Sequence, residues 1–275
     1  MKLYPRQKFR KMNKKIIPVL FAGYVFAENR LMLDTRREYF GNDIKIAHIS
    51  DVHKRRFGKN NSRICRLIRR ENPDIVFITG DLVSRKERNF STAENMLAGL
   101  CEIAPVYMIY GNHEQTLPAE MKKEFLKVIR RTGVKILANN SAETEINGRK
   151  LHIFGLAESH RVYRNGRSYR NLAEITSGEM NNLLGQCPDG ETILLAHNPF
   201  FAEAYSQWGA EYTLSGHVHG GVIRIFGKGI LSPERKFFPP YSKGVYEIDG
   251  MKLLVSGGLG KFRLFNPPEI VIYKI

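Results

Sequence analysis

The sequence contains little cysteine. Its 275 residues include three cysteines, Cys65, Cys101 and Cys187, which cannot all pair with one another and show no metal-binding spacing. We therefore expect ordinary buried thiols and no disulfide framework. The chain also lacks internal repeats, low-complexity linkers and any sign of a second globular domain, so its length predicts one large α/β domain with an ample core.

The sequence also lacks a long apolar run near its start. The uncharged stretch from Ile16 to Ala27 has twelve residues, which is short of the ~20 that a helix needs to span a bilayer. It follows a basic run from Lys2 to Lys15 that contains no acid. No small-residue cleavage site is evident, so a cleaved signal peptide is not indicated. The pattern predicts shallow insertion into a membrane or a marginal anchor, and a buried first helix or strand is the alternative.

Acidic residues are few relative to basic ones. The chain has 27 Asp and Glu against 43 Lys and Arg, a formal net charge of +16. This excess favours anionic partners such as phosphates, nucleic acid or acidic lipid headgroups. However, the basic residues do not alternate with aromatic ones as on a base-stacking surface, and no nucleic-acid-binding motif is present. A simple nucleic-acid-binding protein is therefore the weaker hypothesis, while nucleic acid stays open as a partner.

What the sequence does contain is a repeated placement of metal-ligand side chains at strand ends. The run from Ile44 to Ile49 is typical of a short buried strand, and Asp51 and His53 follow it directly. Because residues i and i+2 of an extended segment lie on one face, this carboxylate and imidazole can bind the same ion.

The same placement recurs four times further along the chain. Each later case follows a short apolar run: Asp81 follows Ile75–Ile78, Asn112 and His113 follow Val106–Ile109, His197 follows Ile193–Leu195, and His217 and His219 follow Tyr212–Leu214. Helix-like segments alternate with these runs, and sites in α/β sheets form at the carboxyl ends of strands. We therefore expect these side chains to converge. The remaining histidines that we considered lack such a context and are expected to be structural: His48, His152 and His160.

The set of ligands indicates which ions would bind. Carboxylate oxygens combined with neutral imidazoles suit Mn²⁺, Zn²⁺ or Fe better than Ca²⁺, which prefers an all-oxygen shell. The ligands are too many for one ion and fit two, and two ions ~3.5–4 Å apart are a common arrangement for cleaving phosphoesters. Asp81 stands alone at its strand end and is the best candidate for a carboxylate that bridges both ions.

These motifs resemble those of the calcineurin-like metallophosphoesterase superfamily. The matching residues are Asp51-Val52-His53, Gly80-Asp81, Gly111-Asn112-His113-Glu114, His197 and Gly216-His217-Val218-His219. The resemblance implies a four-layer α/β/β/α sandwich of two mixed β-sheets flanked by helices. It also implies that one metal is held by Asp51, His53, Asp81 and His219, and the other by Asp81, Asn112, His197 and His217. By the same resemblance His113 is a catalytic residue, a general acid or oxyanion stabiliser, and not a ligand.

Other segments resemble a bacterial membrane-linked branch of that superfamily. They are Ala27–Leu31, Leu195–Pro199, Gly257–Gly260 and Phe262–Ile270. The branch is related to pyrophosphatases of the UDP-2,3-diacylglucosamine type and to cell-wall-associated members. Three departures are visible: Val218 stands where Thr is common, Val222 stands where Gln is common, and the apolar stretch near the start is short. The two valines are not ligand types, so these two departures concern substrate choice and not metal binding.

Together these observations predict a dinuclear metal-dependent phosphoesterase. We expect it to hydrolyse phosphodiester or pyrophosphate bonds of a lipid-linked or envelope-related substrate, by attack of a metal-bridging hydroxide. The ions are expected to be Mn²⁺, with Zn²⁺ or Fe as alternatives. A nuclease or nucleotide phosphodiesterase on the same fold is the nearest alternative function. Arg161, Arg164 and Arg167 are candidate substrate contacts because guanidinium groups bind phosphate oxygens in pairs, although a merely solvated basic loop is the alternative.

The predicted domain organisation has two parts. Residues 1–40 form a basic N-terminal segment with a short apolar stretch, and residues 41–275 form the metallophosphoesterase domain. We expect the first part to associate with the bacterial cytoplasmic membrane. If it spans the membrane, the basic run stays in the cytoplasm and the catalytic domain is extracytoplasmic; a cytoplasmic catalytic domain is the alternative.

Overall fold

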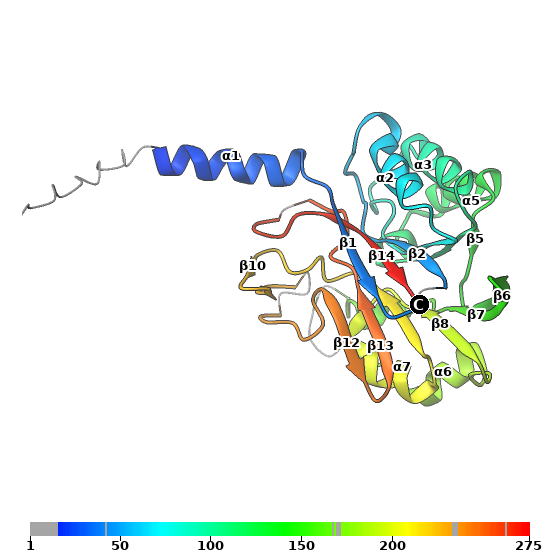
Figure 1. Cartoon of the computed structure of the whole chain (residues 1–275). Coiled ribbons are helices and arrows are strands. Elements are labelled where there is room, and N and C mark those ends of the chain that lie inside the picture. The colour runs from blue at the N-terminus through cyan, green and yellow to red at the C-terminus, as the bar shows by residue number, and fades with distance from the viewer. Residues whose placement is uncertain (1–15, 42, 167, 169–171, 233–235, 262) are drawn as a thin grey trace, which may run out of the picture.

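Two mixed β-sheets form the centre of the molecule. The computed structural model describes residues 16–41, 43–166, 168, 172–232, 236–261 and 263–275. Within these residues, two six-stranded sheets pack face to face and helices cover their outer faces (Figure 1). The predicted four-layer sandwich is confirmed. The basic run from Lys2 to Lys15 lies outside the described residues.

The first sheet carries the N-terminal half of the predicted site. Its strands, in spatial order, are β1 (Asp34–Tyr39), β14 (Glu269–Lys274), β2 (Lys45–Ile49), β3 (Ile75–Thr79), β4 (Val106–Ile109) and β5 (Lys135–Ile136). The strands from β2 to β5 pair in parallel, and β14 lies antiparallel to β2 and parallel to β1. Both faces of β3 are buried, which explains why its sequence is uninterruptedly apolar.

The second sheet carries the C-terminal half. Its strands, in spatial order, are β12 (Gly244–Ile248), β13 (Met251–Val255), β9 (Tyr212–Ser215), β8 (Glu191–Leu195), β7 (Arg149–Gly155) and β6 (Asn140–Ile146). β6 and β7 form the predicted hairpin, with Asn147 and Gly148 at its turn in the left-handed conformation. A separate two-stranded ribbon, β10 (Arg224–Ile225) with β11 (Lys228–Gly229), projects from the body.

Helices pack on the two outer faces. α2 (Ser62–Glu71), α3 (Ser91–Cys101) and α5 (Ala119–Thr132) cover the first sheet, and α6 (Ser177–Leu184) and α7 (Ala202–Trp208) cover the second. A single helical turn, α4 (Asn112–Gln115), follows β4 directly. The layer between the sheets is filled by large side chains such as Phe77, Tyr107 and Tyr273, whose burial fixes the two sheets against each other.

The apolar stretch near the start folds as helix α1 (Ile16–Arg30), which extends away from the domain (Figure 1). Val19 and Leu20 are 70% and 65% exposed, so the alternative of a buried first element is not supported. Among the described residues, no helix has the length and apolar character to cross a bilayer. β1 follows α1 and pairs with β14, although its sequence Asp-Thr-Arg-Arg-Glu-Tyr gives no apolar strand signal. The division at residue 40 stays a prediction.

Candidate metal centre

The predicted ligands converge where the carboxyl ends of strands from both sheets meet. Asp51 and His53 follow β2, Asp81 follows β3, and α4 brings in Asn112 and His113 after β4. His197 follows β8, and His217 and His219 follow β9 in the second sheet. The parallel pairing of β2, β3 and β4, and of β8 with β9, directs these ends to one place.

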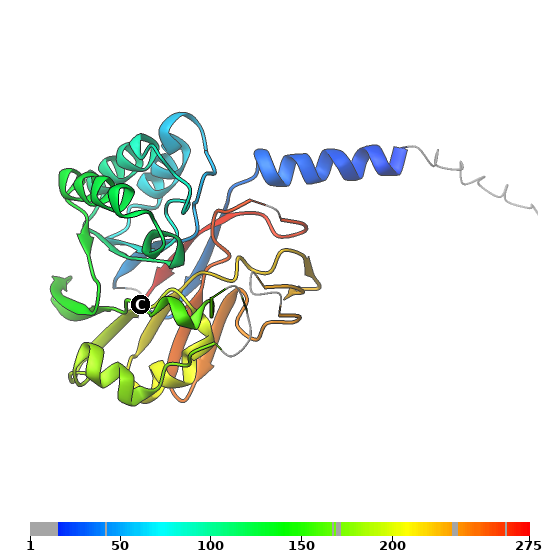
Figure 2. The ribbon, with the colours of Figure 1, turned by 180° about the vertical axis from the view of Figure 1, so that it is seen from behind.

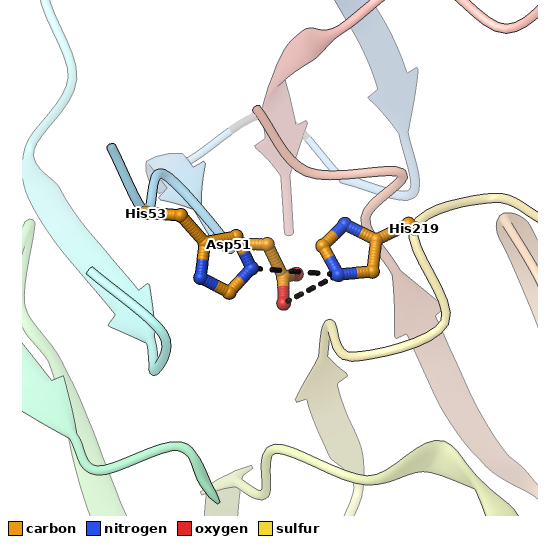
Figure 3. Close-up of side chains that lie close together, drawn as sticks. All are labelled: Asp51, His53 and His219. Atoms are coloured by element: carbon orange, nitrogen blue, oxygen red, sulfur yellow. Dashed lines mark hydrogen bonds and ion pairs between the residues drawn. The ribbon is translucent and has the colours of Figure 1, made fainter. Parts of the chain in front are cut away.

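One group of ligand atoms is formed by Asp51, His53 and His219 (Figure 3). His219 Nε2 lies 3.8 Å from Asp51 Oδ1 and 3.4 Å from His53 Nε2. All three ligand atoms lie within 4.8 Å of one another. The geometry therefore allows these side chains to hold one cation, as three of the four residues predicted for the first metal.

Asp81 lies at the centre of the wider cluster. Its Oδ2 is 3.6 Å from His197 Nε2, 3.8 Å from His53 Nε2 and 4.0 Å from His113 Nε2. Candidate groups for a cation accordingly include Asp51, Asp81 and His197 on one side, and His53, Asp81 and His113 on the other. The carboxylate predicted to bridge two ions thus faces ligands from both sheets.

Asn112 and His217 complete the predicted second site. The Asn112 carboxamide lies 3.1 Å from Asp81 Oδ2 on one side and 3.1 Å from an Arg85 nitrogen on the other. With its nitrogen toward Asp81 the carboxamide makes a hydrogen bond, whereas with its oxygen toward Asp81 a cation is needed between the two oxygens. The His217 ring packs against the His197 ring at 5.0 Å between centroids, and its backbone N–H donates to Asp51 Oδ2.

The backbone at these ligands is in an uncommon conformation. Asp51, His53, Asp81, His217 and His219 have φ between 49° and 67°, in the left-handed region. Such conformations cost ~1–3 kcal/mol for residues other than glycine and cluster at functional sites. Each strand therefore turns abruptly at its ligand, and the turn aims the side chain into the centre.

Two glycines permit the close approach of neighbouring segments. A Cβ atom on Gly111 would lie 2.3 Å from Asp81 Oδ1, and one on Gly216 would lie 1.8 Å from Ser50 Oγ. Any side chain at either position would displace a ligand-bearing loop. Glycine, which lacks a Cβ atom, is the residue that permits such an approach directly before Asn112 and His217.

Supporting contacts fix the orientation of the ligands. The carboxylate of Glu114 accepts hydrogen bonds from the backbone N–H groups of Asp81 at 2.8 Å, Val83 at 2.9 Å and Gly111 at 2.9 Å. This role of Glu114 is not predicted from the sequence, although Glu114 stands in the Gly-Asn-His-Glu motif. His197 Nδ1 lies 2.6 Å from the Thr79 carbonyl oxygen and donates a hydrogen bond to it. This contact leaves Nε2 of the ring to face Asp81.

The electrostatics of the centre are those of a site built for a cation. Burial by itself raises the pKa of Asp81, but the charges of His197, His53 and His113 hold this pKa well below its usual range. Burial lowers the pKa of His197, yet the Asp81 carboxylate raises it to about 10. The Asp81 carboxylate therefore favours positive charge at the position that His197 faces. In addition, Asp51 Oδ1 is buried without a hydrogen-bond partner among the described residues. The residues fit a divalent ion of the Mn²⁺, Zn²⁺ or Fe class.

The structure describes two of the three arginines predicted to contact the substrate. Arg161 is exposed in a short helical turn, Arg164 is half-buried, and Arg167 lies outside the described residues. Between the two arginines, Tyr163 is buried, and its ring centroid lies 4.8 Å from that of His217. The loop therefore borders the centre through Tyr163. The roles of the three arginines stay predictions.

Comparison with known proteins defines the class. The family model described as calcineurin-like phosphoesterase matches residues 44–221, which contain all of the candidate ligands. The chain belongs to this family and is a metal-dependent phosphoester hydrolase.

Several relatives match most of the chain. An "Uncharacterized metallophosphoesterase" of Aquifex aeolicus is 30% identical over 94% of this chain and 97% of its own length. The phosphodiesterase YaeI of Escherichia coli is 26% identical over 84% of this chain and 82% of its own. A bovine "Transmembrane protein with metallophosphoesterase domain" is 26% identical over 75% of this chain and 46% of its own.

A solved structure shares the fold. A Staphylococcus aureus protein named "Putative 5′-Nucleotidase" superimposes with a TM-score of 0.50 and 14% sequence identity, over 80% of this chain and 49% of its own. At this identity the likeness concerns the fold alone.

Proposed function

We propose that this phosphoesterase binds two divalent ions and hydrolyses phosphodiester or pyrophosphate bonds of a lipid-linked or envelope-related substrate. The observation that carries the dinuclear part is the position of Asp81, whose Oδ2 has imidazole nitrogens within 4.0 Å from both sheets. Asp51, His53, Asp81 and His219 would hold one ion. Asp81, Asn112, His197 and His217 would hold the other. Mn²⁺ is the first choice, with Zn²⁺ or Fe as alternatives.

When bound, the two ions supply Lewis acidity and lower the pKa of a water molecule. The protein's contribution is to fix the ligands. Thr79 orients His197, and Glu114 ties the Asp81 and Gly111 backbones together. Preorganisation of this kind avoids reorganisation when charge develops on the phosphoryl oxygens.

His113 suits the role of an oxyanion stabiliser. Burial, more than nearby charge, lowers the pKa of His113 to about 4, so the ring is neutral at pH 7. Its Nδ1 accepts the backbone N–H of Arg85 at 3.3 Å, which leaves the ring proton on Nε2. Nε2 faces Asp81 across 4.0 Å. An N–H there can donate to a leaving-group or phosphoryl oxygen but has no lone pair for a metal.

A membrane location for the enzyme is supported by α1. Ile17, Val19 and Leu20 are exposed near the start of α1, which projects from the domain (Figure 1), and one relative is named a transmembrane protein. We place the enzyme at the bacterial cytoplasmic membrane. Full-length protein should sediment with membranes and resist salt washes, and replacing Val19 and Leu20 by serine should release it. Full-length protein that stays soluble at low salt would contradict this location.

The test of the reaction is a hydrolysis screen after loading with Mn²⁺, Zn²⁺ or Fe²⁺. The substrates are bis(p-nitrophenyl) phosphate, a pyrophosphate-linked nucleotide lipid and single-stranded DNA. We expect turnover of the first two, with the lipid preferred. The His53→Ala variant serves as the metal-site control. Turnover of DNA with steep salt dependence would favour a nuclease instead, and no turnover with any metal would overturn the proposal.

A further inference from the structure

A strongly basic pocket lies beside the metal centre. It has a volume of about 620 Å³ and lies between the C-terminal end of α1, the segment that follows β2, and the segment that follows β3. Its lining includes seven Lys and Arg residues and one acid, Glu87. The basic residues are Arg30, Lys54, Arg55, Arg56, Lys86, Arg88 and Lys261.

These cations form no ion pairs within 4.0 Å with carboxylates of the described residues. All except Arg55 are solvent-exposed. Like charges gathered in one concave place repel one another, and an anion of the phosphate class relieves that repulsion while accepting several hydrogen bonds.

An apolar groove adjoins the basic pocket. Its volume is about 610 Å³, and Val25 and Phe26 of α1 line it opposite Val222, Ile223 and Leu264. The groove and the basic pocket share Asn29, Arg30 and Lys261 as lining residues. Figures 1 and 2 show α1 and the β10–β11 ribbon projecting from the same end of the molecule. A basic cavity continuous with an apolar one matches the two halves of an amphiphile.

The wall between groove and pocket is held in place. Arg55 donates to the backbone oxygens of Glu28 and Gly260, each at 2.9 Å. The Glu28 carboxylate is buried and accepts the backbone N–H groups of Phe265 and Asn266. The end of α1 is therefore fixed to the loop that follows β13, and a ligand would meet a preorganised site.

The basic pocket also lies next to residues of the metal centre. Lys54 and Arg55 directly follow the candidate ligand His53 in the chain. A small cavity lined by His53 shares Lys54, Arg55, Arg56 and Glu87 with the basic pocket. The basic pocket thus adjoins the segment that follows the candidate ligand His53, and the apolar groove adjoins the basic pocket.

We infer that the basic pocket binds a second anionic group of the substrate, of the phosphate class, and that the apolar groove binds its hydrocarbon chain. This inference rests on the proposed phosphoesterase function and deepens it. The substrate is then an amphiphile with at least two anionic groups, one hydrolysed at the metal centre and one held by Arg56, Lys86, Arg88 and their neighbours.

The experiment compares two triple variants of the full, metal-loaded chain. The pocket variant carries Arg56→Ala, Lys86→Ala and Arg88→Ala. The control carries Arg66→Ala, Arg70→Ala and Arg130→Ala, which remove the same charge from exposed positions on α2 and α5. The probes are dihexanoyl phosphatidic acid, glycerol 3-phosphate and dihexanoyl phosphatidylcholine, measured by titration calorimetry. KM and kcat are measured for bis(p-nitrophenyl) phosphate and for a short-chain pyrophosphate-linked lipid.

The pocket variant should bind dihexanoyl phosphatidic acid and glycerol 3-phosphate about tenfold more weakly, since three charge contacts to the anion are lost. KM for the short-chain lipid should rise by a similar factor, with kcat and the hydrolysis of bis(p-nitrophenyl) phosphate unchanged. A Phe26→Ser variant in the groove should weaken the binding of dihexanoyl phosphatidic acid about threefold and leave the binding of glycerol 3-phosphate unchanged.

Equal effects of the pocket and control variants would overturn the inference, because they would mean a general charge effect. Weaker binding of dihexanoyl phosphatidic acid with an unchanged KM for the short-chain pyrophosphate-linked lipid would also overturn it, because the pocket would then bind an anionic lipid that is not the substrate. If wild-type protein hydrolyses nothing, the proposed function fails. The calorimetric comparison still decides whether the pocket and groove bind an anionic amphiphile.

Discussion

The metal centre and the basic pocket are neighbours built on opposite principles. In the metal centre the side chains are short, buried or half-buried, and fixed by left-handed backbone turns at strand ends. In the basic pocket they are long, exposed except for Arg55, and carried by loops and the end of a helix. The first arrangement selects a coordination geometry, whereas the second selects only a sign of charge and a size. We therefore expect single substitutions to act steeply in the first region and gradually in the second.

The largest effect is expected from Asp81→Ala. Because Asp81 faces ligands from both sheets, its removal should abolish binding of both ions and reduce turnover to background, a loss of about 10⁶-fold or more. Metal content measured by elemental analysis, with circular dichroism to verify folding, provides the test. A variant that keeps both ions would show that Asp81 does not bridge. Asp249→Ala, at an exposed turn, is the matched control.

His113→Ala tests whether a residue inside the metal centre can be lost without losing metal. We expect both ions to stay bound and kcat to fall by about 10²–10⁴. The loss should shrink for substrates with good leaving groups, such as bis(p-nitrophenyl) phosphate, because they need less stabilisation of the departing oxygen. Loss of an ion together with equal rate losses for all leaving groups would make His113 a ligand.

A third cluster differs from the basic pocket because its cations, Lys243 and Arg36, are paired with a carboxylate. The buried Glu269 carboxylate lies 2.7 Å from Lys243 Nζ and 3.3 Å from Arg36 Nε. Glu269→Gln leaves those charges unpaired and should lower the free energy of unfolding by about 3–5 kcal/mol. Chemical denaturation measures this change. A loss below about 1 kcal/mol would mean that the cluster is as weakly coupled as exposed ion pairs.

The pH dependence of the same cluster has a defined sign. Burial raises the pKa of Glu269, but Lys243 and Arg36 bring it below its ordinary value of 4.5. Its stabilisation is therefore fully present above pH 4.5 and is lost as the pH falls through the lower folded-state pKa. Glu269→Gln should remove this part of the acid sensitivity. An unchanged acid-unfolding curve would argue against it.

Glu114→Gln probes the support beneath the metal centre. The carboxylate accepts three backbone N–H bonds, and an amide can accept fewer without placing its own N–H groups against these donors. We expect metal affinity to drop about 10- to 100-fold, as is typical for residues that orient ligands. Competition with a chelator measures that affinity. Glu124→Gln, on the exposed face of α5, should have no effect on metal affinity.

The smallest effect is that of salt. Exposed charges are screened within ~8 Å at physiological ionic strength, whereas buried ones are screened much less. Raising salt from low to moderate concentration should increase KM for an anionic lipid about two- to fivefold and leave kcat unchanged. The pocket variant should show a flatter salt response. An equal response in both proteins would place the salt-sensitive contact elsewhere.

The metal centre could be predicted from the sequence because each candidate ligand directly follows an apolar run, and parallel strands bring such positions together. Tertiary effects were harder to predict. β1 has a charged sequence and becomes a strand only because the edge of β14 is available to it. The basic pocket could not be predicted from the sequence because its lining comes from four separate segments, near residues 30, 55, 87 and 261, which share no motif. Glu114 belongs to the Gly-Asn-His-Glu motif, yet its three backbone contacts depend on how the ends of β3 and β4 meet.

The place of β14 in the first sheet has a consequence for biosynthesis. β14 lies between β1 and β2 in the sheet. Because β14 is the last strand in the sequence, all other strands of this sheet leave the ribosome before it, and β1 and β2 stay separate until it arrives. Until then, β1 and β2 each expose an edge of unpaired N–H and C=O groups, which invites pairing with other chains. The nascent chain thus passes through a period in which it needs protection, for example by chaperones, and a translational pause before residue 269 would prolong that period.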